Sequence, residues 1–142
     1  MLTARRAAAY RDLSSDLAPA WFVGPVLGVA AEHVVVSSGN HEQVELLLGR
    51  WGLRGGFREV LATGSPGVPA GQPKAHRLAV RLAGVAATAV VLEDAPRYLA
   101  QAAGAGARTV GVAHRLNDLS AVRCDLVVAH NWPGRWERRP LP

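Results

Sequence analysis

The sequence predicts an α/β protein with three layers, in which helices cover both faces of a parallel β-sheet. From residue 33 onward, short β-branched apolar runs alternate with segments of helical periodicity. The runs are apolar throughout, as expected for strands buried on both faces, and the linking segments are long enough for crossovers between parallel strands. The 142 residues fit one domain of this kind.

Two helices are expected before the first strand. Residues 2–18 carry alanine, leucine and arginine at helical spacing and predict a helix that ends near Pro19. Residues 21–31 predict a short helix that is distorted, because glycine and proline interrupt the apolar sequence.

The alternating part begins with a buried strand at residues 33–36, which ends in a polar loop. Ser38 or Asn40 can cap the helix that follows. The further expected elements are, in order, a helix at 41–51, a strand at 57–62, a loop rich in glycine and proline at 63–73, a helix at 74–84, a strand at 89–92, a helix at 96–103, a strand at 109–113, a helix at 116–121 and a strand at 125–129.

The composition excludes several classes of protein. Hydrophobic residues make up 49% and charged residues 19%, which is typical of a folded domain. The net charge of +5 comes from scattered arginines, so no nucleic-acid surface is predicted, and the basic, aromatic residues 135–139 are interpreted as a solvated terminus. No apolar run reaches the roughly 18 residues of a membrane span.

The location is expected to be cytoplasmic. Cys124 is the only cysteine, which excludes an internal disulfide, and it is expected to be a buried, inert thiol at the start of a strand. The N-terminus has acidic residues and no long apolar core after its first arginines, so a secretory signal is not predicted.

Candidate chemistry centres on the acidic pair Glu93-Asp94, the chain's only Glu-Asp doublet, which follows the apolar run 89–92. Two adjacent carboxylates raise each other's pKa unless a cation lies between them. A divalent metal would remove this conflict, and Mg²⁺ prefers such oxygen ligands. The alternative is a solvated pair at the start of a helix, where negative charge suits the helix dipole.

A phosphate site is predicted around this pair. Ser37 follows the first predicted strand and Lys74 begins a predicted helix. Because the carboxyl ends of parallel strands meet at one edge of a sheet, Ser37, Lys74 and the acidic pair are expected to converge. The Ser37 hydroxyl and the amides of Ser38 and Gly39 would bond phosphoryl oxygens, Lys74 would neutralise charge, and the acidic pair would hold Mg²⁺.

Other polar and aromatic residues are expected to have ordinary structural roles. His41 and His76 are interpreted as solvated side chains on a loop or a helix face. The remaining ones are placed at the rim of the crevice or over the end of the sheet: His114, His130, Asn131, Trp132 and Trp136.

Two stretches resemble the core of haloacid dehalogenase (HAD) superfamily phosphohydrolases, in the branch of phosphoglycolate phosphatase and phosphoglucomutase. The family's second motif, with its helix and next strand, is similar to VVVSSGNHEQVELLLGRWGLRGGFREVLATG. The third and fourth motifs, with the helix and strand after them, are similar to GQPKAHRLAVRLAGVAATAVVLEDAPRYLAQAAGAGARTVGVAHRLND. The resemblance covers roughly 85 residues, and the order of the motifs is more specific than any one of them.

The resemblance implies a Rossmann-like, HAD-like core at residues 32–130, followed by a C-terminal tail at 131–142. It also implies that Ser37 contacts the phosphoryl group, that Lys74 is the catalytic lysine, and that Asp94, helped by Glu93, binds Mg²⁺. The substrate would be a small phosphorylated metabolite.

The position of the catalytic lysine has an alternative. The family's third motif commonly reads Gly-Lys-Pro, and alignment on the proline would place Gln72 where the lysine stands. Lys74, two residues later, is preferred because it is the only lysine and precedes a leucine-containing helix.

One part of the family's pattern has no counterpart. The family begins with a strand that ends in Asp-x-Asp, whose first aspartate is the nucleophile. Asp12 and Asp16 do not match, because they lie in polar, helical sequence. Residues 1–31 are therefore expected to be a helical cap remnant and a lead-in helix, and the chain a truncated or inactive phosphatase.

The absence of that first strand predicts a structural problem. In the family it lies in mid-sheet, between the strands expected here at 33–36 and 89–92. Without it, these strands are expected to pair directly, to keep open edges at the cost of stability, or to be completed by another chain or a second copy.

Three functions remain open from the sequence. The first is the core of a Mg²⁺-dependent phosphohydrolase. The second is a non-catalytic HAD-like protein that binds phosphate and metal or supports oligomerisation. The third is an unrelated doubly wound binding module, because fold resemblance does not by itself establish function.

Overall fold

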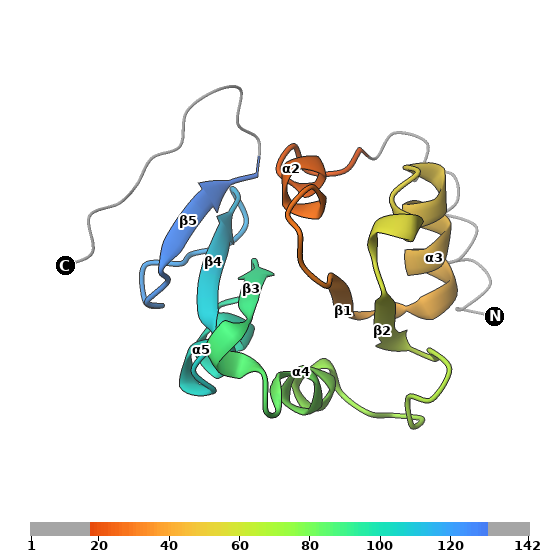
Figure 1. The fold of residues 1–142 in the computed structure, drawn as a ribbon. Coiled ribbons are helices and arrows are strands. Elements are labelled where there is room, and N and C mark those ends of the chain that lie inside the picture. Colours follow the sequence, from red (N-terminus) through yellow and green to blue (C-terminus); the bar gives the residue numbers. More distant parts are fainter. Residues whose placement is uncertain (1–17, 131–142) are drawn as a thin grey trace. The chain divides into compact units, whose positions relative to one another are not determined.

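A computed structural model describes residues 18–130, and the chain forms two compact units, Met1–Lys74 and Ala75–Pro142 (Figure 1). The expected helix at 2–18 lies almost entirely outside the described residues. The tail, with Asn131, Trp132 and Trp136, also lies outside them, and the predicted division at residues 31 and 130 stays a prediction.

The first unit contains a parallel β-α-β arrangement. Its described elements are α2 (Val23–Leu27), β1 (Val34–Asn40), α3 (His41–Arg50), the 3-10 helix η1 (Arg54–Gly56) and β2 (Glu59–Thr63). β1 and β2 pair in parallel, and α3 lies against both strands (Figure 1). The core of the unit is formed by Leu48, Val60 and Ala62, packed against Val35, Val44, Leu53 and Phe57.

Short-range interactions set both ends of α3. Asn40 Oδ1 accepts a hydrogen bond of 2.9 Å from Glu42 N–H, so Asn40 is the one of the two predicted caps that the structure confirms. The helix ends at Arg50, and Gly52 then adopts a φ of +66°, a conformation that residues with side chains rarely take. The sequence therefore specifies where this helix begins and ends.

β1 is longer than predicted, because the polar residues 37–40 belong to the strand. The pairing register with β2 shifts between Val36 and Asn40, so this end of the strand is irregular. The Thr63 hydroxyl donates to the Ser38 carbonyl at 3.3 Å and bridges the polar end of β1 to the end of β2. Serine, glycine and asparagine are typical turn residues, which is why the sequence alone indicated a loop.

The second unit is built on three parallel strands. Its elements are α4 (Lys74–Leu82), the 3-10 helix η2 (Ala86–Thr88), β3 (Val90–Glu93), α5 (Pro96–Gly104), β4 (Arg108–Ala113) and β5 (Leu126–Ala129). The strand order is β3-β4-β5, and α5 lies against β3 and β4 (Figure 1). Its buried residues include Leu99, Ala102, Ala107, Thr109, Val112 and Val128.

The helix predicted at residues 116–121 was wrong, since the segment between β4 and β5 consists of turns and bends. Asn117 Oδ1 accepts from His114 N–H at 2.8 Å, and Asp118 Oδ1 accepts from Ser120 N–H at 2.8 Å. Side-chain acceptors of this kind give backbone N–H groups a partner other than the helical carbonyl. They explain why a segment with apolar residues at suitable spacing does not become helical.

Cys124 lies just before β5 and is buried, as predicted. Burial, together with the neighbouring Asp125 carboxylate, raises the pKa of the Cys124 thiol above its ordinary value. A raised pKa lowers the fraction of reactive thiolate, in line with the expectation of an inert thiol.

The structure confirms an α/β fold with parallel strands and corrects the prediction of a single sheet, because the strands form two open sheets. β1 belongs to the sheet of the first unit and β3 to the sheet of the second, and the direct pairing considered from the sequence stays a prediction. Completion of an edge by another chain stays a prediction. None of the described helices combines the length and the apolar character needed to cross a membrane.

Candidate functional site

The predicted phosphate-binding residues Ser37, Ser38 and Gly39 lie at the carboxyl end of β1, directly before α3. Gly39 N–H donates to Ser37 Oγ at 3.0 Å. A phosphoryl oxygen would have to replace this bond in order to accept from the Gly39 amide. A Cβ at Gly39 would lie only 3.2 Å from Ser37 Oγ, so the segment is folded closely on itself.

Lys74, the predicted catalytic lysine, is the first residue of α4 and is partly buried. The alternative residue, Gln72, lies in the turn before the helix, where its backbone N–H donates to Pro69 O at 3.1 Å. The turn depends on Gly71, whose φ is +76°. The predicted helix start is therefore confirmed, and the catalytic role of Lys74 stays a prediction.

The acidic pair lies where it was predicted, at the carboxyl end of β3 and before α5. Glu93 Oε1 accepts from Ala95 N–H at 3.1 Å. Partial burial of Asp94 acts to raise its pKa, but hydrogen bonds with the side chains of Glu93 and His114 outweigh this effect and lower the Asp94 pKa below its ordinary value. Asp94 is thus kept ionised, as a ligand for a cation has to be.

The loop after β4 contacts Asp94. His114 Nε2 lies 3.1 Å from Asp94 Oδ2. Asn117 Nδ2 donates to the Asp94 carbonyl at 2.8 Å and to the Val112 carbonyl at 2.9 Å. The side chain of Asp94 nevertheless remains 56% exposed, so one face of its carboxylate is open to solvent.

The sequence predicts His114 at the rim of the crevice and indicates no role for Asn117. The contact between His114 and Asp94 could have been predicted from the positions of the two residues along the chain. His114 is the first residue after β4 and Asp94 the first after β3, and residues that follow adjacent parallel strands are neighbours. The contribution of Asn117 has no such signal, because it depends on the path of an irregular loop.

The predicted site residues form two groups in the structure. Ser37, Ser38 and Gly39 belong to the first unit and the acidic pair to the second. The convergence of the two groups stays a prediction.

Within the described part of the chain, no metal site is formed by three or more His, Cys, Asp or Glu side chains. The rings of His114 and His130 lie near each other at the carboxyl ends of β4 and β5, with centroids 6.5 Å apart. The acidic pair remains the best donor set, because Mg²⁺ is commonly held by one or two carboxylates and completed by water and phosphate.

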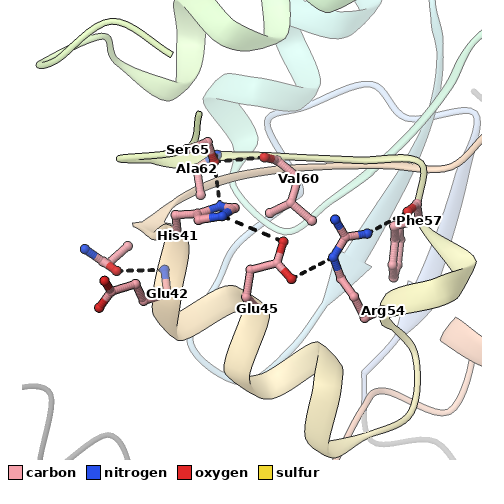
Figure 2. A network of polar contacts seen from close by, with 9 residues as sticks. His41, Glu42, Glu45, Arg54, Phe57, Val60, Ala62 and Ser65 are labelled. Atoms are coloured by element: carbon pink, nitrogen blue, oxygen red, sulfur yellow. Dashed lines mark hydrogen bonds and ion pairs between the residues drawn. The ribbon is translucent and has the colours of Figure 1, made fainter. Parts of the chain in front are cut away.

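The first unit contains a polar network that the sequence did not indicate (Figure 2). Ser65 Oγ lies 2.8 Å from His41 Nδ1, and His41 Nε2 lies 3.8 Å from Glu45 Oε1. Glu45 Oε2 accepts from Arg54 Nε at 2.6 Å, and Arg54 Nη1 donates to the Phe57 carbonyl at 2.8 Å. Serine, histidine and a carboxylate are the residue types of a hydrolase triad.

Ser65 is not arranged as a nucleophile. Its Oγ accepts from Ala62 N–H and donates to the Val60 carbonyl, both at 2.8 Å, and the residue is only 4% exposed. Because the single hydroxyl proton goes to Val60, His41 has to be the donor toward Ser65, whereas a catalytic histidine accepts the serine proton. The network is therefore structural and joins α3 and η1 to β2, and His41 is part of it, contrary to its predicted solvated role.

Comparison with known proteins adds no assignment to this geometry. No protein-family model matches the chain, and no curated protein sequence matches it.

Proposed function

We propose that the protein is a HAD-like α/β protein that binds Mg²⁺ and phosphate, and that it represents the core of a phosphohydrolase. The observation that carries this proposal is the position of the adjacent carboxylates Glu93 and Asp94, between the end of β3 and the start of α5. Two neighbouring carboxylates that are both ionised are stabilised by a cation between them. They lie at the carboxyl end of a parallel strand, where α/β proteins bind their ligands.

The donor set at this edge suits Mg²⁺. Asp94 is ionised and partly open to solvent, and Glu93 offers a second carboxylate. Both ligands are hard oxygen donors, and the remaining positions around Mg²⁺ in phosphate-handling sites are filled by water and phosphate. When bound there, Mg²⁺ would neutralise charge on a phosphoryl group.

The phosphate part of the proposal rests on Ser37, Ser38, Gly39 and Lys74. The first three precede Asn40, the N-cap of α3, a helix of ten residues whose N-terminus favours negative charge. A small phosphorylated metabolite is the proposed ligand. The cytoplasm is the proposed location, in keeping with a single, buried cysteine.

Hydrolysis is not proposed for these residues alone. Lys74 would stabilise the phosphoryl group and Ser37 would hydrogen bond to it, but neither supplies the carboxylate nucleophile of the resembling family. No Asp-x-Asp sequence occurs among the 142 residues. Binding is therefore the expected activity of these residues, and turnover would need a nucleophile from outside the 142 residues.

Isothermal titration with Mg²⁺ tests the metal site. The wild-type chain is expected to bind Mg²⁺, and Asp94→Asn is expected to weaken binding at least about 10-fold, because it removes the ionised ligand. Asp118→Asn is the matched control, since it removes the same charge from an exposed position. Equal affinities of wild type and Asp94→Asn would contradict the proposed site.

Titration with inorganic phosphate in the presence of Mg²⁺ tests the second group of residues. Lys74→Ala and Ser37→Ala are each expected to weaken phosphate binding several-fold, because each removes a polar contact to the phosphoryl oxygens. p-Nitrophenyl phosphate is expected not to be hydrolysed. Turnover by the purified chain would show that a nucleophile is present after all.

A further inference from the structure

We infer that His114 and Asn117 are positioning residues, which hold Asp94 in one orientation and keep imidazole nitrogen out of the metal site. Both lie in the loop after β4, and Asp94 lies in the loop after the neighbouring strand β3. The consequence for metal binding rests on the proposed function, whereas the hydrogen bonds are those of the chain itself.

The two ring nitrogens of His114 have different partners. Leu116 N–H lies 3.1 Å from His114 Nδ1, and an N–H can only donate. Nδ1 therefore carries a lone pair, and the proton of the neutral ring is on Nε2, which lies 3.1 Å from Asp94 Oδ2. Because an ionised carboxylate can only accept, the neutral Nε2–H tautomer satisfies both contacts.

The orientation of the Asn117 amide is equally determined. Its Oδ1 accepts from His114 N–H at 2.8 Å, and its two Nδ2 protons go to the carbonyls of Val112 and Asp94 at 2.9 and 2.8 Å. Exchanging the oxygen and the nitrogen would place an NH₂ group against an N–H and an oxygen against two carbonyls. One side chain thus links the end of β4, the loop after it and the backbone of Asp94.

These contacts hold Asp94 at both its backbone and its side chain. A carboxylate that is already held loses less rotational freedom when it binds a cation than a mobile one does. His114 itself has no nitrogen left for a metal, because Leu116 N–H occupies the Nδ1 lone pair and Nε2 carries the proton. His114 is thereby excluded as a nitrogen ligand, and the carboxylate oxygens of the acidic pair are donors that suit Mg²⁺ better than metals that prefer imidazole.

The tautomer is tested first, in the metal-free wild-type chain. Long-range ¹H–¹⁵N spectra of ¹⁵N-histidine-labelled protein at neutral pH are expected to show a pyridine-like Nδ1 and a pyrrole-like Nε2 for His114. The signal is assigned by its absence in His114→Phe, or through backbone resonances if this variant does not fold. An Nδ1–H tautomer, or a ring that averages between the two, would overturn the inference.

Mg²⁺ titration of variants tests the positioning role. His114→Phe and Asn117→Ala are each expected to raise the Kd for Mg²⁺ about 10-fold, and His114→Gln, which keeps an N–H donor, is expected to recover part of the loss. His76→Phe, at an exposed position of α4, is the control and is expected to match wild type. Amide spectra outside residues 94–117 verify that the variants keep the fold.

The outcomes separate the two proposals. If wild type binds Mg²⁺ and both loop variants bind it equally well, the positioning role is wrong while the Mg²⁺ site stands. If wild type binds no Mg²⁺, the proposed function fails, and the tautomer of His114 alone decides whether the loop holds Asp94 as inferred.

Discussion

The Ser65 hydroxyl connects several parts of the first unit by hydrogen bonds. Its oxygen satisfies backbone groups of Val60 and Ala62 in β2 and meets His41 at the start of α3. Gly64, with a φ of +84°, allows the chain to turn so that Ser65 folds back onto the strand it has just left. This one hydroxyl group therefore links α3, β2 and the turn that follows β2.

Replacing Ser65 with alanine is expected to lower the free energy of unfolding by about 1–3 kcal/mol, because backbone groups that are buried in β2 lose their partner. Urea denaturation followed by tryptophan fluorescence measures the change. Ser38→Ala, at an exposed position of the same unit, is expected to stay within about 0.5 kcal/mol of wild type. Similar losses in both variants would show that the Ser65 contacts do not stabilise the fold.

The carboxylate of Asp125 makes stability depend on pH. Thr109 N–H donates to Asp125 Oδ2 at 2.7 Å, and this backbone bond, aided by the Thr109 hydroxyl and by Arg108, lowers the pKa of Asp125. As the pH falls below about 4, the ordinary value for Asp, the unfolded chain takes up a proton first. The stabilisation is present at neutral pH and is lost as the pH falls through the lowered pKa.

Asp125→Asn is therefore expected to flatten the acid side of the stability profile while keeping an oxygen that can accept from Thr109. Thermal unfolding between pH 2 and pH 7 measures the effect. Asp118→Asn is not suitable as the control, because hydrogen bonds with Ser120 lower the pKa of Asp118 as well. Glu42→Gln serves as the control, and an unchanged slope in Asp125→Asn would contradict the assigned role.

At the scale of single residues, the sequence predicts what depends on neighbours in the chain. The Asn40 cap and the position of the acidic pair after a strand are of this kind. The contact between Asp94 and His114 spans 20 residues, and that between His41 and Ser65 spans 24. Such contacts depend on strand register and loop path, which residue types do not reveal.

Among the elements, β4 is the central strand of its sheet and packs closely against the segment that follows it. A Cβ on its buried residue Gly111 would lie 2.9 Å from Leu119 Cδ1 and 3.0 Å from Cys124 Sγ. The segment between β4 and β5 therefore packs closely against the strand at this point. A side chain at position 111 would force this segment away from the strand.

Gly111→Ala is expected to destabilise the protein by about 1–3 kcal/mol, because the extra methyl group overfills this contact. Gly104→Ala is the matched control, since Gly104 ends α5 with nothing within 4 Å of its Cβ position. The control is expected to be neutral or to stabilise by up to about 1 kcal/mol. Denaturant midpoints of both variants, compared with wild type, provide the measurement.

The elements that the sequence predicted correctly are those with an apolar pattern bounded by glycine or proline. α5 is an example, since Pro96 begins it and Gly106, with a φ of +92°, follows its end. The segment 116–121 failed because polar side chains compete for the backbone there. Apolar periodicity predicts which face of a segment can be buried, but it does not predict whether polar side chains will take the backbone hydrogen bonds of a helix.

At the scale of the whole chain, the division after Lys74 follows a long exposed connection. Three glycines in the segment 64–73 have a positive φ and lie in turns: Gly64, Gly67 and Gly71. Most residues of this segment are exposed. The sequence predicted the loop from its glycine and proline content. It did not predict two sheets, because alternation identifies strands without identifying their partners.

Among residues 18–130, brief digestion with proteinase K is expected to cut first within residues 66–72, because exposed turns are open to a protease. Mass spectrometry of the fragments locates the cut. The turn between β4 and β5 is the comparison within the same chain, since Asn117 ties it to two other segments. A first cut in that turn would mean that the connection between the units is the better protected segment.

The pairing of the strands has a consequence for the order of folding. Each pairing in the described part of the chain joins a strand to the next one in sequence, β1 to β2, β3 to β4 and β4 to β5. Each of these parallel pairings is closed by one crossover segment and needs no strand from elsewhere in the chain. The described strands of the first sheet end at residue 63, so they leave the ribosome before those of the second sheet. The chain is therefore suited to fold in steps during its synthesis, with the first unit formed while the second is still being made.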